Sequence, residues 1–295
     1  MPTLIRTALF VPANRPDRIE KAIATRADVI IIDLEDAVPL SEKESSRSNV
    51  REKVALFPER VILVRINPLD SPFVKGDLNE AIVKGVNGIV LPKVDKVEDV
   101  HTINSLLHKL EKDRSFPDGS IRVFPLIESA VAVQHIYDIV STKTRPDRID
   151  TVMFGAADYT LDMGIEMTMK GDELFYARSR IAIACRAADI APPVDTPFMI
   201  DLENTEALIS DAKRAKELGF QGKLVIHPDQ VEPCNKIFSP LPEEIKKAEK
   251  IVNAFEEAEA EGVAAIRLEG KFIDYPVVKR SRDILALAAA IDRKR

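Results

Sequence analysis

Short apolar runs recur along the whole chain at fairly even intervals. The clearest is residues 29–32, one valine followed by three isoleucines, which is typical of a parallel strand buried on both faces. Residues 191–194 give the weakest strand prediction, because two of the four are prolines and proline cannot donate a ladder hydrogen bond. The predicted strands lie at residues 7–11, 29–32, 61–64, 89–91, 121–127, 151–154, 191–194 and 223–226.

Longer segments with helical character separate these runs. Asn14 is the expected N-cap of the first helix, and Gly219 is a favourable residue just past the helix over 203–218. Residues 159–171, which contain several methionines, are expected to form a loop over the mouth of the fold. The predicted helices lie at residues 14–26, 42–56, 78–84, 96–112, 129–140, 173–188, 203–218, 242–261 and 276 to the end.

Strands that alternate with helices through eight repeats predict an α/β fold of the (β/α)8 TIM-barrel type. An open doubly wound sheet is the alternative, but Pro-Ala-Asn-Arg follows the first strand where a dinucleotide fold has a Gly-rich turn. The barrel is expected over residues 1–240, and residues 241–295 exceed what a barrel needs. We expect the latter to form a C-terminal helix and lid segment.

Composition narrows the class of protein further. The 295 residues carry a net charge of −6, which disfavours general nucleic-acid or anionic-membrane binding. Cys185 and Cys234 form neither a disulfide framework nor a metal-binding spacing, as expected of reduced thiols. The N-terminal residues show no secretory signal pattern, and no apolar stretch is long enough to cross a bilayer. These features predict a soluble cytoplasmic protein.

Ionisable residues follow nearly every predicted strand, and the carboxyl ends of barrel strands form the active face of this fold. Glu128 and Asp158 end two consecutive runs, so a parallel arrangement places them side by side. Two converging carboxylates are suitable ligands for Mg²⁺, although both acids could instead cap the helices that follow. The strand-end residues are Arg15, Asp33, Arg65, Lys93, Glu128, Asp158, Asp195 and His227.

Arg65 is a candidate for holding a substrate carboxylate, because its guanidinium matches a carboxylate in bidentate fashion. It could equally pair with Asp33 or Asp36 and neutralise the mouth. Asp195 is expected to orient a lysine or arginine there rather than to act in catalysis. His227 is either a site residue or hydrogen-bonded to nearby backbone.

Several motifs resemble the family of citrate lyase β-subunits and malyl-CoA lyases, within the HpcH/HpaI-type Mg²⁺-dependent aldolase and lyase superfamily. The resemblance follows chain order over nearly the full length. It is carried by Arg6-Thr-Ala-Leu-Phe-Val-Pro-Ala-Asn-Arg15, Asp33-Leu-Glu-Asp-Ala-Val38 with Lys43 and Arg47, Val64-Arg-Ile-Asn67, Leu91-Pro-Lys93, Leu126-Ile-Glu128, Gly155-Ala-Ala-Asp158 and Gly270-Lys-Phe-Ile-Asp274.

This resemblance implies a barrel assembled as a homotrimer or a dimer of trimers. It implies Mg²⁺ bound by Glu128 and Asp158, and Arg65 bound to the carboxylate of a 2-oxo acid. Contacts to CoA map onto Arg15, and less specifically onto Arg18 and Lys21, which are as well explained as the solvated face of the first helix. Asp274 becomes a candidate general acid/base supplied to the neighbouring subunit; from local sequence alone it is a helix cap.

The expected function is therefore Mg²⁺-dependent carbon–carbon cleavage or formation of a 3-hydroxyacyl thioester. Citryl-, malyl- and citramalyl-CoA all fit, as does a thioester on an acyl-carrier protein, with a 2-oxo acid as the other reactant. In this scheme Arg65 and Glu128 bind substrate, and Arg65 and Asp274 are catalytic. The alternatives are a CoA-independent class II pyruvate or oxaloacetate aldolase, and an acyl-carrier-docking subunit with little activity alone.

Overall fold

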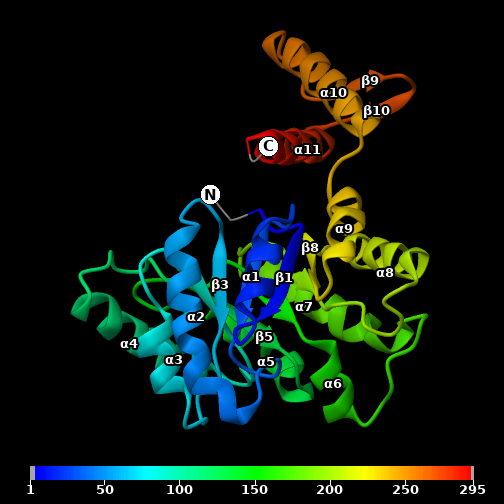
Figure 1. Cartoon of the computed structure of the whole chain (residues 1–295). Coiled ribbons are helices and arrows are strands. Elements are labelled where there is room, and N and C mark those ends of the chain that lie inside the picture. The colour runs from blue at the N-terminus through cyan, green and yellow to red at the C-terminus, as the bar shows by residue number, and fades with distance from the viewer. Residues whose placement is uncertain (1–3, 294–295) are drawn as a thin grey trace. The chain divides into compact units, whose positions relative to one another are not determined.

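Eight parallel strands close into a barrel in the computed structural model, which describes residues 4–293 (Figure 1). Each strand pairs with its neighbours in sequence, and β1 closes the ring against β8. The predicted (β/α)8 TIM-barrel fold is thereby confirmed. The strands are β1 (Thr7–Pro12), β2 (Val29–Asp33), β3 (Ile62–Arg65), β4 (Gly88–Leu91), β5 (Arg122–Ile127), β6 (Met153–Phe154), β7 (Val194–Asp195) and β8 (Gly222–Val225).

Helices surround the strands on the outside of the barrel (Figure 1). They are α1 (Pro16–Ile23), α2 (Lys43–Leu56), α3 (Val74–Ala81), α4 (Val97–Asp113), α5 (Ala130–Ser141), α6 (Ala156–Met163), α7 (Phe175–Ala187), α8 (Thr205–Glu217) and α9 (Val231–Phe238), with short 3-10 turns η1 (Leu40–Glu42), η2 (Asp172–Leu174) and η3 (Pro228–Gln230). Among the described residues 4–293, no helix is both long and apolar enough to cross a membrane.

Alternate strand residues fill the barrel interior, because successive side chains of a strand point to opposite faces. The whole of β2 is buried, as its run of β-branched residues predicts. Neighbouring residues on each strand face the helix layer instead. The interior cluster includes Ala8, Ile31, Leu63, Val90, Phe124, Leu126, Met153, Val194 and Leu224.

Some local predictions were wrong. Asn14 does not cap α1: the cap position is Arg15, with no side-chain hydrogen bond, and Asn14 Nδ2 instead donates to Glu42 Oε2 at 2.7 Å. The predicted loop over 159–171 begins later than expected, because α6 continues to Met163. The proline-containing seventh run does form a strand, but β7 has only two residues.

The chain divides into two compact units between Asn235 and Lys236, within α9. The second unit contains α10 (Pro242–Ala260), α11 (Tyr275–Asp292) and an antiparallel hairpin of β9 (Ile266–Leu268) and β10 (Lys271–Ile273). Phe255 and Val278 lie in its small core. The sequence predicted the two helices but not the hairpin, whose turn uses Gly270 at φ +78°.

A buried charge network joins β7 and β8 to the helix layer. Asp195 accepts from Arg178 Nε at 2.9 Å and pairs with Lys223 Nζ at 2.6 Å. Both cations also reach Asp211 of α8. Lys223 precedes the inward-facing Leu224, so these charges lie between strands and helices. Asp195 therefore orients cations there, and the expectation that it does so at the mouth was wrong.

Asp211→Asn is expected to lower the free energy of unfolding at pH 7 by about 3 kcal/mol, because it removes one partner from a buried ion-pair network. Burial alone raises the pKa of Asp211, but Lys223 and Arg178 outweigh it and hold that pKa below its ordinary value. A depressed folded-state pKa contributes stability above the unfolded-state value, and this contribution is lost as pH falls through the folded-state value. Urea denaturation from pH 7 to pH 3 measures both effects.

Asp229→Asn serves as the matched control, because Asp229 pairs with His227 on the surface with 88% of its side chain exposed. Exposed pairs contribute roughly 0–1 kcal/mol, so little change is expected. Equal effects of the two substitutions would show that the buried network does not stabilise the barrel.

Candidate active site

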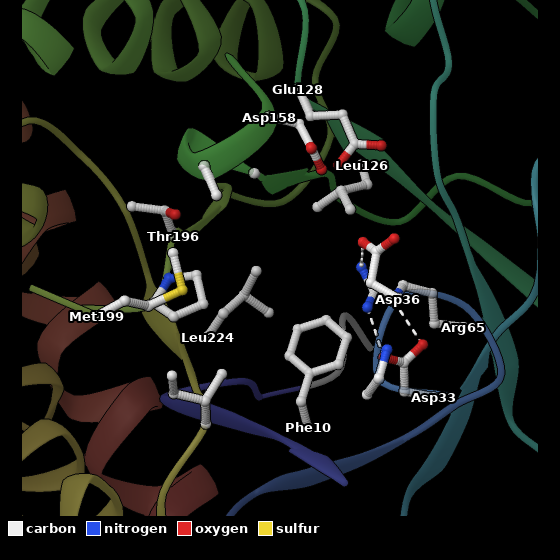
Figure 2. A pocket seen from close by; sticks show the side chains of 15 residues that line it. Phe10, Asp33, Asp36, Arg65, Leu126, Glu128, Asp158, Thr196, Met199 and Leu224 are labelled. Atoms are coloured by element: carbon white, nitrogen blue, oxygen red, sulfur yellow. Dashed lines mark hydrogen bonds and ion pairs between the residues drawn. The ribbon is translucent and has the colours of Figure 1, made fainter. Parts of the chain in front are cut away.

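A pocket of about 330 Å³ opens among the carboxyl ends of the barrel strands (Figure 2). Arg65 and Asp33 end neighbouring strands there, and Glu128 directly follows β5. The pocket is lined by Phe10, Asp33, Asp36, Ala37, Arg65, Leu126, Glu128, Gly155, Ala157, Asp158, Thr196, Pro197, Met199, Leu224 and Ile226.

Glu128 and Asp158 lie together at one end of this pocket (Figure 2). The reason is the pairing of β5 with β6, which aligns Ile127 with Phe154 and so brings the two strand ends side by side. Neither acid caps a helix: the cap of α5 is Ser129, and the cap position of α6 is Gly155. Neither acid is therefore the N-cap residue of the helix that follows it, although Asp158 lies in the first turn of α6, where a negative charge is favourable.

Backbone groups fix the position of the Glu128 carboxylate. Glu128 Oε1 accepts from the Lys93 backbone N–H at 2.8 Å. Lys93 adopts a left-handed conformation with φ +53°, which costs a non-glycine residue roughly 1–3 kcal/mol. On the other side, Gly155 leaves room for Glu128, because a Cβ there would lie 2.8 Å from Oε2. The site therefore holds this carboxylate in one place.

The charge balance at this end of the pocket favours a cation. Burial raises the pKa of Glu128 to about 8, with help from the negative charges of Glu35 and Asp158 and against the hydrogen bond from the Lys93 backbone N–H. Within residues 4–293, no group of three or more His, Cys, Asp or Glu side chains forms a metal cage. Two carboxylates with open positions fit Mg²⁺, which keeps waters or substrate oxygens in its shell.

Arg65 is paired with carboxylates from the end of β2 and the loop that follows it. Its Nε donates to Asp33 Oδ1 at 2.7 Å, and its Nη2 donates to Asp33 Oδ2. Nη1 donates to Asp36 Oδ2 at 3.3 Å, and the guanidinium lies 4.9 Å from the centre of the Phe10 ring. The neutralising role is thus present in the structure. A guanidinium has five N–H groups, so two remain for a ligand.

Glu35 is a buried residue of the site that was not among the residues listed at the strand ends. It is 5% exposed, and its Oε2 lies 3.0 Å from Arg65 Nη1 without accepting a hydrogen bond. Burial raises the pKa of Glu35 to about 7 although Arg65 opposes the shift. The sequence signal was three acids, Asp33, Glu35 and Asp36, within the four residues that follow the run of one valine and three isoleucines. Lys43 Nζ holds this loop by donating to the Leu34 and Glu35 carbonyls at 3.0 and 2.9 Å.

The predicted CoA-binding residues Arg15, Arg18 and Lys21 are exposed at α1 and do not line the pocket. Arg15 Nε lies 3.3 Å from Asp17 Oδ1. These assignments remain predictions.

Asp274 belongs to the second unit, where it caps α11 by accepting from Val277 N–H at 3.3 Å. The cap function is present, and its catalytic role stays a prediction. His227 caps η3 by accepting from the Asp229 N–H at 3.3 Å, as the backbone alternative proposed.

Comparison with known proteins gives the family. The profile of the HpcH/HpaI aldolase/citrate lyase family matches residues 6–228. The chain belongs to this family. It is 38% identical over 289 residues to the citrate lyase subunit beta of Leuconostoc mesenteroides subsp. cremoris, covering 97% of this chain and 94% of that protein. It is 32% identical over 310 residues to the L-malyl-CoA/beta-methylmalyl-CoA lyase of Cereibacter sphaeroides (strain ATCC 17025), covering 97% and 95%.

Among solved structures of the family, CitE from Mycobacterium tuberculosis in complex with magnesium, acetoacetate and coenzyme A matches with a TM-score of 0.78. The two chains are 28% identical, and the match covers 98% of this chain and all of that one. CitE has also been solved with oxaloacetate and magnesium. The predicted family and the enzyme class, a lyase, are confirmed, and the expected Mg²⁺ agrees with these HpcH/HpaI relatives.

Gly155→Ala is expected to weaken Mg²⁺ binding by about 10-fold, the low end of effects seen when the surroundings of a metal ligand change. Gly155 has φ −106°, so alanine fits the backbone, but its Cβ would lie 2.8 Å from Glu128 Oε2 and must displace that side chain. Calorimetric titration with Mg²⁺ measures the change.

Gly164→Ala is the matched comparison at the other end of α6. Gly164 has φ +66° and nothing within 4 Å of its would-be Cβ, so alanine there costs stability without touching the site. Unchanged Mg²⁺ affinity in Gly155→Ala would mean that Glu128 does not depend on this space.

Proposed function

We propose that this family member cleaves or forms the carbon–carbon bond of a 3-hydroxyacyl thioester, such as citryl-, malyl- or citramalyl-CoA. The observation that carries the proposal is one cavity that joins two adjacent carboxylates, Glu128 and Asp158, to an arginine, Arg65. The related citrate lyase subunits and malyl-CoA lyases support it. The two products of cleavage are an acyl thioester and a 2-oxo acid.

Glu128 and Asp158 would hold Mg²⁺, since their oxygen donors and the negative charge around them suit a hard divalent cation. When bound, the ion supplies Lewis-acid polarisation of the substrate's hydroxyl or keto oxygen and a template for its carboxylate. Magnesium in the structures of CitE supports this assignment. Lys93 and Gly155 keep Glu128 in position for it.

Arg65 would orient the substrate carboxylate with its remaining N–H groups, while Asp33 and Asp36 hold the guanidinium in place. In cleavage, the 3-hydroxyl gives up its proton to solvent and the C2–C3 bond breaks. The electron pair of that bond moves onto C2, where the thioester carbonyl stabilises it as an enolate, and C3 becomes the carbonyl carbon of the 2-oxo acid. Protonation of C2 then gives the acyl thioester, a step we assign to Asp274 of a neighbouring subunit.

The thioester end is assigned to the surface at the start of α1, where Arg15, with Arg18 and Lys21, supplies positive charge for CoA phosphates. We propose a cytoplasmic homotrimer or hexamer, in which a neighbouring subunit supplies Asp274 to the site. The barrel is proposed as residues 1–240, followed by a lid-bearing segment over 241–295. A CoA-independent aldolase and an acyl-carrier-docking subunit are the competing functions.

Assay of the purified full chain with malyl-CoA, citryl-CoA and citramalyl-CoA separates these functions. We expect release of a 2-oxo acid with Mg²⁺ and its loss after treatment with a chelator. Turnover of free hydroxy acids but no thioester would indicate the aldolase. Turnover only on addition of an acyl-carrier protein would indicate the docking subunit.

A further inference from the structure

The pocket has an unusual charge balance for a site that binds acids. Its lining residues, all within the described part of the chain, include one basic side chain, Arg65, and four acidic ones, Asp33, Asp36, Glu128 and Asp158. Asp33 and Asp36 already occupy three N–H groups of that arginine. One bound Mg²⁺ leaves the lining with a net negative charge.

The floor of the pocket is apolar. Phe10, Leu126 and Leu224 reach it from β1, β5 and β8; in Figure 2, Leu126 lies beside the Glu128–Asp158 end, Leu224 towards Met199, and Phe10 towards Arg65 and Asp33. Leu126 and Leu224 are 3% and 1% exposed, so their positions are fixed by barrel packing. A substrate group over this floor exchanges water for hydrocarbon, which favours an alkyl group and penalises a charge.

The 2-oxo acid products of the candidate thioesters differ in what they place here. One carboxylate of each can be held by the metal site and Arg65. Oxaloacetate then carries a second carboxylate on its CH₂ group, whereas pyruvate carries a methyl hydrogen in its place. Lys93, whose charge acts on Glu35, is exposed and does not line the pocket. A second carboxylate would therefore meet either acids or hydrocarbon without a counter-charge.

Resting on the proposed function, we infer that the 2-oxo acid handled by this chain is a monocarboxylic one with a small alkyl group, of the pyruvate class. The matching thioester carries a hydroxyl, one carboxylate and a small alkyl group on carbon 3. Family membership does not decide this point, because structures of CitE contain either oxaloacetate or pyruvate. The lining of this chain's own pocket does: Phe10, Leu126 and Leu224 select the alkyl group.

The test compares pyruvate, 2-oxobutyrate and freshly dissolved oxaloacetate as partners of acetyl-CoA in the presence of Mg²⁺. Initial rates of new thioester formation by chromatography give kcat/KM, and calorimetric titration gives affinity. We expect pyruvate to exceed oxaloacetate by at least about 10-fold in both measurements, as one uncompensated charge contact is worth at least this much. A ratio below 10 overturns the inference while thioester formation upholds the proposed function. Absence of binding and of condensation with every 2-oxo acid overturns both.

A variant at the rim tests the electrostatic cause directly. Met199 lines the pocket and is half-buried, so a longer polar side chain can replace it without disturbing the core. Met199→Lys is expected to lower the pyruvate-to-oxaloacetate ratio at least 5-fold relative to Met199→Gln, which has similar length and no charge. Equal ratios in the two variants contradict the charge argument, and thermal denaturation of each variant checks that it is folded.

Discussion

Glu128→Gln is expected to weaken Mg²⁺ binding by more than about 100-fold, beyond the cost typical of changes in groups that only support a metal ligand. Turnover of the thioester should fall by roughly 10³-fold, because several kcal/mol of charge stabilisation is lost with the metal. Asp158→Asn should give the same result, since Glu128 after β5 and Asp158 in the first turn of α6 would supply one ligand each. Calorimetric titration and initial rates measure the two losses independently of each other.

Asp162→Asn is the matched control for this pair. Asp162 lies one helical turn after Asp158 on α6, is exposed, and accepts from the Ala130 N–H outside the pocket. We expect the Mg²⁺ affinity and the turnover of the Asp162→Asn variant to stay within 2-fold of those of the parent chain, as for other surface changes. If Glu128→Gln and Asp158→Asn still bind Mg²⁺ as tightly as the parent chain, the metal does not bind at this end of the barrel.

Arg65→Lys should reduce kcat/KM by about 10- to 200-fold, corresponding to the roughly 1.5–3 kcal/mol carried by a hydrogen bond to a charged group. Lysine keeps the positive charge next to Asp33 and Glu35 but loses the planar fork. The loss should be accompanied by weaker binding of pyruvate. Steady-state kinetics and calorimetry with Mg²⁺ present measure both quantities.

Arg65 also balances the charge of three carboxylates, Asp33, Glu35 and Asp36. A loss of activity in Arg65→Lys must therefore be distinguished from unfolding of the variant. Arg180→Lys makes the same chemical change at an exposed position of α7 and should leave activity and stability unchanged. Thermal denaturation should show Arg65→Lys still folded. Full activity in folded Arg65→Lys would show that the guanidinium only neutralises the loop acids.

The sequence predicted the parts of this structure that depend on alternation. Once β5 and β6 are recognised as neighbours, Glu128 and Asp158 must approach each other, because parallel strands end on one side. Hence the barrel fold and the Glu128–Asp158 end of its pocket could be predicted from the sequence alone.

Features that depend on loop conformation were less accessible. Glu35 lies two residues beyond β2, and its burial depends on how Lys43 holds that loop. The Lys93 contribution is a backbone N–H presented by a left-handed residue, which no side-chain pattern reports. Asn14 failed as a cap because Glu42, distant in sequence, takes its side chain. Such tertiary contacts override local preference.

Crystals grown with Mn²⁺ in place of Mg²⁺ test the central claim most directly, because manganese has a measurable anomalous signal and similar oxygen ligands. We predict one anomalous peak bonded to a carboxylate oxygen of both Glu128 and Asp158. A peak bonded to neither, or well-ordered Glu128 and Asp158 side chains with no peak at a saturating Mn²⁺ concentration, would contradict the account.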